Sequence, residues 1–142
     1  MKISKPIYTC LWFEDNALDA ATFYCSIFED AHIEQQNPFA LLFKLNGTTF
    51  MALHGGPKYF HSPAVSFVID CDTQEQIDYF WEKLGADGRY DRCGWLTDKF
   101  GISWQIVPTI LPQLMADESK RDNVVKAFMQ MSKFDIQTLL EA

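Results

Sequence analysis

The first half of the chain opens with a β-rich run followed by apolar residues at helical spacing. Residues 7–13 carry mainly β-branched, aromatic and aliphatic side chains, which favour a strand. Asp15 or Asn16 can cap the helix that follows, because both side chains accept hydrogen bonds from N–H groups of a first helical turn. The positions that define this helix are Ala17, Ala20, Ala21, Phe23, Tyr24 and Ile27.

Three shorter runs complete this half. Residues 32–35 predict a short strand, and residues 39–45 and 48–54 predict two more, joined by Asn46 and Gly47. Asn-Gly between apolar runs is a strong hairpin signal, because a type I′ turn needs positive φ at both central residues. The first half is therefore predicted to be βαβββ.

The second half repeats this pattern. Residues 64–70 predict a strand, and Asp72 or Thr73 can cap a second helix, whose apolar positions include Ile77, Trp81 and Leu84. Residues of the same type recur 56 positions apart near the start of each half, and the residues that end each half align at an offset of 54. The first offset pairs Leu11 with Phe67, Phe13 with Ile69, Asn16 with Asp72, Phe23 with Tyr79 and Tyr24 with Phe80; the second pairs Gly47 with Gly101, Phe50 with Trp104, Met51 with Gln105 and Leu53 with Val107.

The pattern predicts one α+β domain made of two tandem βαβββ modules that form a cupped mixed sheet. Module 1 covers residues 6–57, module 2 covers residues 63–108, and a helical tail covers residues 109–142. The tail is amphipathic, so it either covers its own sheet or packs on a second subunit.

Composition narrows the class of protein. The chain has 142 residues, 48% of them hydrophobic, and a formal net charge of −7, which makes nucleic acid an unfavourable partner. No stretch is long and apolar enough to span a membrane, and no secretion signal precedes the first strand, so a cytoplasmic protein is expected. The widely spaced cysteines indicate free thiols rather than a disulfide framework; they are Cys10, Cys25, Cys71 and Cys93.

Several longer motifs resemble those of a known family. They are Cys10-Leu11-Trp12-Phe13, Phe23-Tyr24 with Ile27-Phe28, Leu45-Asn46-Gly47, Phe50-Met51-Ala52-Leu53 with Gly55-Gly56-Pro57, and the long stretch from Cys93-Gly94-Trp95-Leu96 through Asp98-Lys99-Phe100-Gly101 to Pro108. Together they resemble the PhnB-like family, also labelled 3-demethylubiquinone-9 3-methyltransferase-like, within the glyoxalase, bleomycin-resistance and extradiol-dioxygenase (vicinal-oxygen-chelate) superfamily. Similar proteins have a longer loop where this chain has only Gln36-Asn37-Pro38, so a flap over the cup is expected to be missing.

The resemblance also implies where a metal would lie. Superfamily members that use metal hold it with His and Glu on the first and last strands of each half, which correspond here to Thr9 or Cys10, Met51, Val65 or Ser66, and Gln105. None of these is a carboxylate or an imidazole, which zinc and nickel require. We therefore expect no metal site of that kind and no cofactor.

Catalytic candidates are few. His54 ends a predicted strand beside two glycines and has suitable basicity for a general base. Cys93 is the best-placed nucleophile, although a buried structural thiol is the simpler interpretation. Asp98 begins a predicted turn with Gly101 at positive φ, and its carboxylate can reach the cup.

A ligand-binding set can be proposed with more support. Trp12, Trp95 and Trp104 can form an apolar wall and stack on a flat molecule, while Ser66 and Gln105 offer hydrogen bonds. Plain core packing of the tryptophans is the alternative.

Three hypotheses about function follow. The first is a homodimer that binds a small, partly apolar or aromatic molecule in a metal-free cup. The second is an enzyme of the same fold, of lyase, isomerase or transferase type, that uses acid–base or thiol chemistry. The third is an interaction protein whose C-terminal helices form the contact surface. The methyltransferase label has no support in the sequence, because no strand is followed by a Gly-x-Gly loop.

Overall fold

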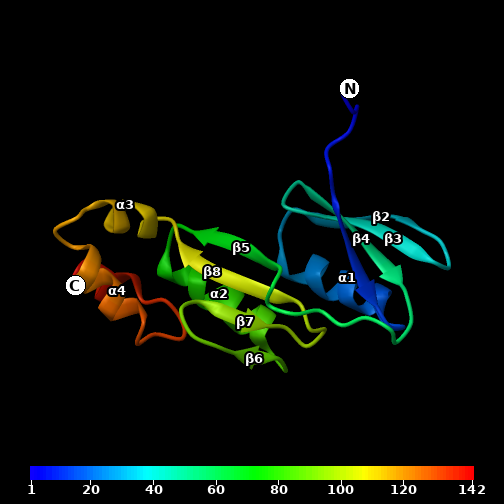
Figure 1. Ribbon diagram of the computed structural model, residues 1–142. Helices are drawn as coiled ribbons and strands as arrows, with labels where there is room; N and C mark the ends of the chain where they lie inside the picture. Colours follow the sequence, from blue (N-terminus) through cyan, green and yellow to red (C-terminus); the bar gives the residue numbers. More distant parts are fainter. The chain divides into compact units, whose positions relative to one another are not determined.

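The computed structural model describes residues 1–142, which divide into two compact units, Met1–Phe60 and His61–Ala142. Each unit contains one four-stranded mixed sheet and a helix that follows its first strand (Figure 1). The predicted α+β fold with two βαβββ modules and C-terminal helices is confirmed. No helix has both the length and the apolar character needed to cross a membrane.

The first unit has a sheet in the order β1-β4-β3-β2, in which β1 runs parallel to β4 and the other pairs are antiparallel. Its elements are β1 (Thr9–Phe13), α1 (Ala17–Ile27), β2 (Ala31–Gln36), β3 (Ala40–Leu45) and β4 (Thr48–His54). Asn46 and Gly47 have φ of 49° and 84°, so the turn between β3 and β4 has the positive φ values that the sequence predicts. The short β2–β3 connection is closed by Asn37, whose side-chain Oδ1 accepts from the backbone N–H of Phe39 and Ala40.

The second unit repeats this topology with the order β5-β8-β7-β6, in which β5 runs parallel to β8. Its elements are β5 (Ser66–Cys71), α2 (Gln74–Gly85), β6 (Arg89–Tyr90), β7 (Trp95–Thr97) and β8 (Ser103–Pro108). Thr73 caps α2 by accepting from the backbone N–H of Gln76 at 3.2 Å, as expected for a threonine at this position. Gly47 and Gly101, paired by the repeat, both have positive φ just before the last strand of their unit.

In each unit, alternate side chains along the strands are buried on the side that faces the helix. Leu11, Phe43 and Phe50 are buried in the first unit, and Leu96, Trp104 and Ile106 are buried in the second. The side chains between them point to the opposite side of the sheet, which no helix of the same unit covers. We call these two surfaces the open face of the first unit and the open face of the second unit.

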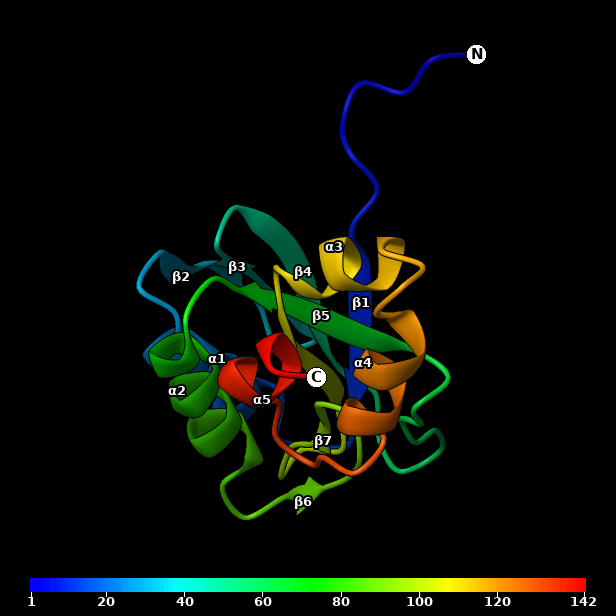
Figure 2. The ribbon, with the colours of Figure 1, turned by 90° about the vertical axis from the view of Figure 1, so that its left-hand side faces the viewer.

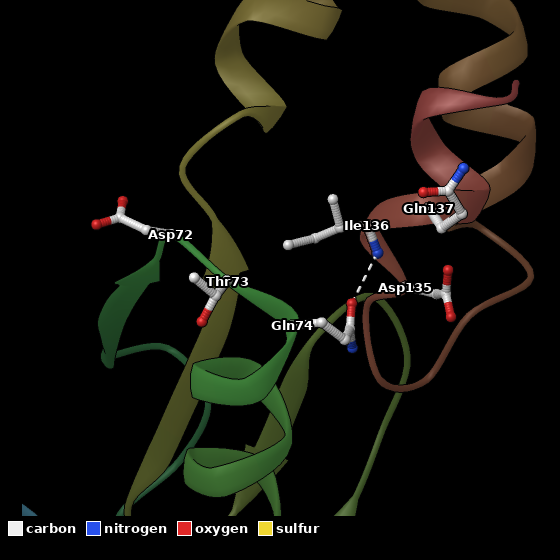
Figure 3. A pocket seen from close by; sticks show the side chains of 6 residues that line it. All are labelled: Asp72, Thr73, Gln74, Asp135, Ile136 and Gln137. Carbon is white, nitrogen blue, oxygen red and sulfur yellow. Dashed lines mark hydrogen bonds between the residues drawn. The ribbon is translucent and has the colours of Figure 1, made fainter.

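The C-terminal helices pack on their own unit. They are α3 (Leu111–Ala116), α4 (Arg121–Phe128) and α5 (Ile136–Leu140). Figures 2 and 3 show α5 beside the start of α2, where Gln74 donates to the carbonyl of Phe134 and accepts from the backbone N–H of Ile136, both at 2.9 Å. Lys133 pairs with Asp78 of α2 at 2.8 Å. The tail therefore packs on α2 of its own unit, and its packing on a second subunit stays a prediction.

The loop before β7 is joined to this tail through backbone groups. The N–H groups of Cys93 and Gly94 donate to the carbonyls of Met131 and Ser132 at 2.9 and 2.7 Å. Gly94 has a φ of 82°, and a Cβ at this position would lie 2.6 Å from both the Ile106 carbonyl oxygen and the Phe134 ring. Only glycine fits this close approach.

We expect Gly94→Ala to destabilise the protein by about 3 kcal/mol or more, because it combines positive-φ strain with a collision against backbone. Gly101→Ala is the matched control: Gly101 has a similar φ of 90° in the same unit, but a Cβ added there would meet nothing within 4 Å. The control should lose only about 1–2 kcal/mol. Urea denaturation measures both, and equal losses would show that neither the β8 backbone nor the tail restricts this position.

Candidate functional site

The open face of the first unit carries an aromatic and aliphatic patch. Trp12, Met51 and Leu53 are half-buried there, and the strand register places Met51 beside Leu42 and Leu53 beside Trp12. Such side chains offer a flat apolar molecule contact area without a large polar desolvation cost.

Trp12 is held in place by the segment that follows β4. Its indole N–H donates to the carbonyl of Gly56 at 2.8 Å, and its ring meets Tyr59 edge to face with 4.9 Å between the ring centroids. A Cβ at Gly55 would lie only 2.2 Å from the indole, so a side chain there would displace the ring. The Gly-Gly-Pro motif therefore positions a tryptophan in addition to ending the module.

The same face becomes polar toward the β3–β4 turn, where it is hollowed into a cleft of about 530 Å³. The side chain of Leu42 lines this cleft on one side, with Lys44 and Thr49 beyond it, and the segment that leads into β1 contributes Lys5 and Tyr8. Glu34 also lines it, with its carboxylate 3.5 Å from the ammonium of Lys44 and 3.3 Å from Nε2 of His32. The first unit thus has a surface that is apolar at one end and charged at the other.

The open face of the second unit holds three of the predicted ligand residues. Trp95 and Gln105 are register partners on β7 and β8, and the side-chain amide of Gln105 donates to the Ser66 hydroxyl at 3.0 Å. Ser103, the partner of Ser66, has a buried hydroxyl without a hydrogen-bond partner. The structure brings Ser66, Trp95 and Gln105 together, as a shared binding surface requires.

Trp104 lies elsewhere. It is 4% exposed on the buried side of β8, next to Phe67 with 5.5 Å between the ring centroids, and its indole N–H donates to Asp98 at 2.9 Å. We therefore assign Trp104 to the core of the second unit and leave it out of the ligand-binding surface.

Asp98 organises the turn before β8. Its Oδ1 accepts from the backbone N–H groups of Phe100 and Ile102, at 2.8 and 3.1 Å, and its Oδ2 accepts from Trp104. The residue is 3% exposed, and the N–H of Gly101 donates to the Asp98 carbonyl, which closes the predicted turn. Each carboxylate oxygen is thus engaged in a structural contact.

The other catalytic candidates lie apart from Asp98 or have structural contacts of their own. His54 is half-buried at the end of β4 in the first unit, where its backbone N–H donates to Phe39. Cys93 lies at a φ of 57°, and its thiol is 3.6 Å from the Phe128 carbonyl oxygen and 3.9 Å from the Met129 sulfur. None of these contacts of Cys93 is a base that could activate the thiol.

The four cysteines remain free thiols. Burial raises the pKa of Cys71 to about 11, and the neighbouring negative charges of Asp70 and Asp72 add to this effect. Cys71 is therefore almost entirely protonated at neutral pH and is a poor nucleophile.

The residues that correspond to metal ligands in the superfamily do lie side by side. Cys10 is the register partner of Met51, and Ser66 bonds Gln105. A thiol with a thioether, and a hydroxyl with an amide, do not supply the imidazole and carboxylate groups that zinc, nickel or manganese use in such sites. Within neither unit do three or more His, Cys, Asp or Glu side chains meet in a way that could hold a metal ion.

Sequence reasoning missed the cleft of the first unit. Part of its lining could have been found from the hairpin. Once Asn46-Gly47 is taken as a two-residue turn, Leu45 pairs with Thr48 and Lys44 pairs with Thr49, which places Lys44 beside Thr49. The position of Glu34 could not be found in this way, because β2 has a bulge between Ile33 and Gln35 that interrupts the pairing.

Another cleft, of about 270 Å³, lies between the starts of α2 and α5 (Figure 3). The side chain of Gln74 on α2 connects the two helix starts, because it bonds to the carbonyl of Phe134 and to the backbone N–H of Ile136. Asp72 and Asp135 also line the cleft, and Asp135 caps α5 by accepting from Thr138. Thr73, Gln74 and Asp135 of this cleft therefore serve helix capping and packing.

Comparison with known proteins agrees with the resemblance of the motifs. Residues 5–107 match a family model described as 3-demethylubiquinone-9 3-methyltransferase. The PhnB protein of Bacillus cereus is 31% identical over 74% of this chain and 100% of its own, with a TM-score of 0.68. No curated protein matches the chain.

Two more distant structures share the fold alone. A Pseudomonas aeruginosa protein is 17% identical over 74% of this chain and 98% of its own, with a TM-score of 0.65. The fosfomycin resistance protein FosX of Listeria monocytogenes, in complex with Mn(II) and sulfate, is 13% identical over 81% of this chain and 98% of its own, with a TM-score of 0.59.

We expect Asp98→Ala to destabilise the protein by about 3 kcal/mol, because it leaves two buried N–H donors and one part-buried N–H donor without their acceptor. Asp91→Ala serves as the control, since its side chain is 45% exposed and pairs with Arg89 in the same unit; it should lose less than about 1 kcal/mol. Chemical denaturation followed by tryptophan fluorescence measures both changes. A wild-type stability for Asp98→Ala would contradict the structural role.

Proposed function

The chain belongs to the 3-demethylubiquinone-9 3-methyltransferase family, which includes PhnB, and from this premise we propose that it binds a small, partly apolar or aromatic molecule in a metal-free cup. One observation supports the proposal most directly. In each unit the helix covers one face of the sheet, and the other face has half-buried apolar and aromatic side chains.

Each open face by itself offers groups that suit such a molecule. In the first unit, Trp12 and Met51 provide aromatic and aliphatic contact. In the second unit, Trp95 provides a ring beside the polar pair Ser66 and Gln105. A few hydrogen-bonding groups among apolar side chains are typical of sites for small molecules.

Methyl transfer is not part of this proposal. A Rossmann-like methyltransferase binds its nucleotide cofactor at a Gly-rich loop between a parallel strand and a helix. Here the segments that lead from the first strand to the helix are Glu14-Asp15-Asn16 and Asp72-Thr73, and neither contains glycine.

Catalysis by acid–base or thiol chemistry is the alternative function, and it has less support. The oxygens of Asp98 hold three N–H groups, and the thiol of Cys93 lies against a carbonyl and a thioether. Of these three candidates, His54 is the one whose side chain makes no hydrogen bond or ion pair in the structure.

The binding proposal is tested with 1-N-phenylnaphthylamine, a neutral probe whose fluorescence rises in apolar surroundings. We expect saturable binding to the wild type, and binding at least about tenfold weaker for Met51→Asp, because a carboxylate on the open face must lose water when the probe binds. Leu18→Asp is the matched control: it makes the same kind of change on α1, where Leu18 is 43% exposed, and should bind as the wild type does.

The absence of saturable binding to the wild type would overturn the proposal. Unchanged binding by Met51→Asp would remove the open face of the first unit from the site.

We also propose that the protein is a homodimer. β1 and β5 are edge strands, and apolar side chains remain exposed at or beside them, including Ile7 at 90%, Val65 at 65% and Val68 at 54%. Open edges with such side chains favour association with another chain. Native mass spectrometry should give twice the 16.4 kDa of one chain, whereas a monomer across micromolar concentrations would contradict this expectation.

A further inference from the structure

We propose that the cleft of the first unit binds an anionic group, such as a carboxylate, of the molecule whose apolar part lies on Trp12, Met51 and Leu53. This inference rests on the proposed function, because the cleft and the apolar patch share one sheet face. It adds the chemical class of the ligand and a binding role for Lys44 and Lys5.

The arrangement of side chains along the face supports this assignment. Leu42 lies between the two ends, since it lines the cleft and is also the register partner of Met51. A molecule that contacts Leu42 can therefore extend toward Met51 in one direction and toward Lys44 in the other. An amphipathic ligand matches this order of side chains.

The charges of the cleft favour an anion. Two lysines, Lys5 and Lys44, line it, and Glu34 is the single acidic residue among its lining residues. This local excess of positive charge occurs in a chain whose formal net charge is −7, so it does not follow from the overall composition. Elsewhere the negative charge of the protein would repel the same ligand.

Lys44 is well placed to change partners. Its side chain is 40% exposed, and its Nζ lies 3.5 Å from Glu34, which is at the long end of an ion pair. Glu34 is also shared with His32 at 3.3 Å. An entering carboxylate can thus take donors from the Lys44 ammonium while Glu34 keeps His32, and Thr49 lies within the same cleft as a further hydroxyl donor.

Two probes of equal shape test the charge preference: 2-naphthoate, an anion, and 2-naphthamide, its neutral counterpart. We expect the wild type to bind 2-naphthoate about three- to tenfold more tightly than 2-naphthamide, with a preference that shrinks as salt is added. Isothermal titration calorimetry measures both dissociation constants.

Variants that remove a positive or a negative charge from the cleft should change the preference for 2-naphthoate in opposite directions, which a purely structural role would not do. Lys44→Gln should abolish the preference and leave 2-naphthamide binding unchanged, whereas Glu34→Gln should increase the preference about two- to fivefold by removing the competing carboxylate. Lys5→Gln should reduce it partially. Lys126→Gln removes the same charge from an exposed site on α4 and should have no effect.

The outcomes distinguish this inference from the proposed function. If 1-N-phenylnaphthylamine binds but 2-naphthoate is not preferred, including the case in which neither naphthalene binds, the anionic subsite is wrong and the apolar site remains. If Lys44→Gln keeps the full preference, the cleft is not the source of it. If the neutral probe fails to bind as well, the proposed function itself fails.

Discussion

The structure depends on the alternation of side chains along its strands, in which successive residues point to opposite faces of the sheet. In each unit, one set of alternate side chains is buried beneath a single helix, and this burial provides most of the apolar stabilisation that a sheet of four strands can obtain. The remaining side chains of each strand lie on the opposite, open face of the sheet. Leu11 and Phe13 are therefore core residues, and Trp12 between them lies on the open face.

Local hydrogen bonds then hold the tryptophans in different ways in the two units. In the first unit, Gly55 and Gly56 form a close-fitting backbone seat for Trp12. In the second, Asp98 fixes Trp104 within the core. The repeat thus preserves topology while its two halves use their aromatic residues for different purposes, and only Trp12 and Trp95 remain on open faces.

The two open faces also differ in polarity. The face of the second unit presents neutral donors and acceptors, with Ser66 and Gln105 already bonded to each other. The face of the first unit ends in a charged cleft built on Lys44 and Glu34. The tail docks on the second unit through Gln74 and Gly94, which do not belong to the proposed binding surface.

The sequence by itself determined the order of the elements, the internal repeat, the Asn46-Gly47 hairpin and the cap at Thr73, because these features depend on side chains a few residues apart. It also carried the motifs that place the chain in its family. Tertiary structure alone decided that Trp104 is a core residue, that the tail packs on its own unit, and that Tyr8, Glu34 and Lys44 line one cleft. These outcomes depend on strand register, on a bulge in β2 and on contacts between residues distant in the chain, none of which a local pattern of apolar and polar positions contains.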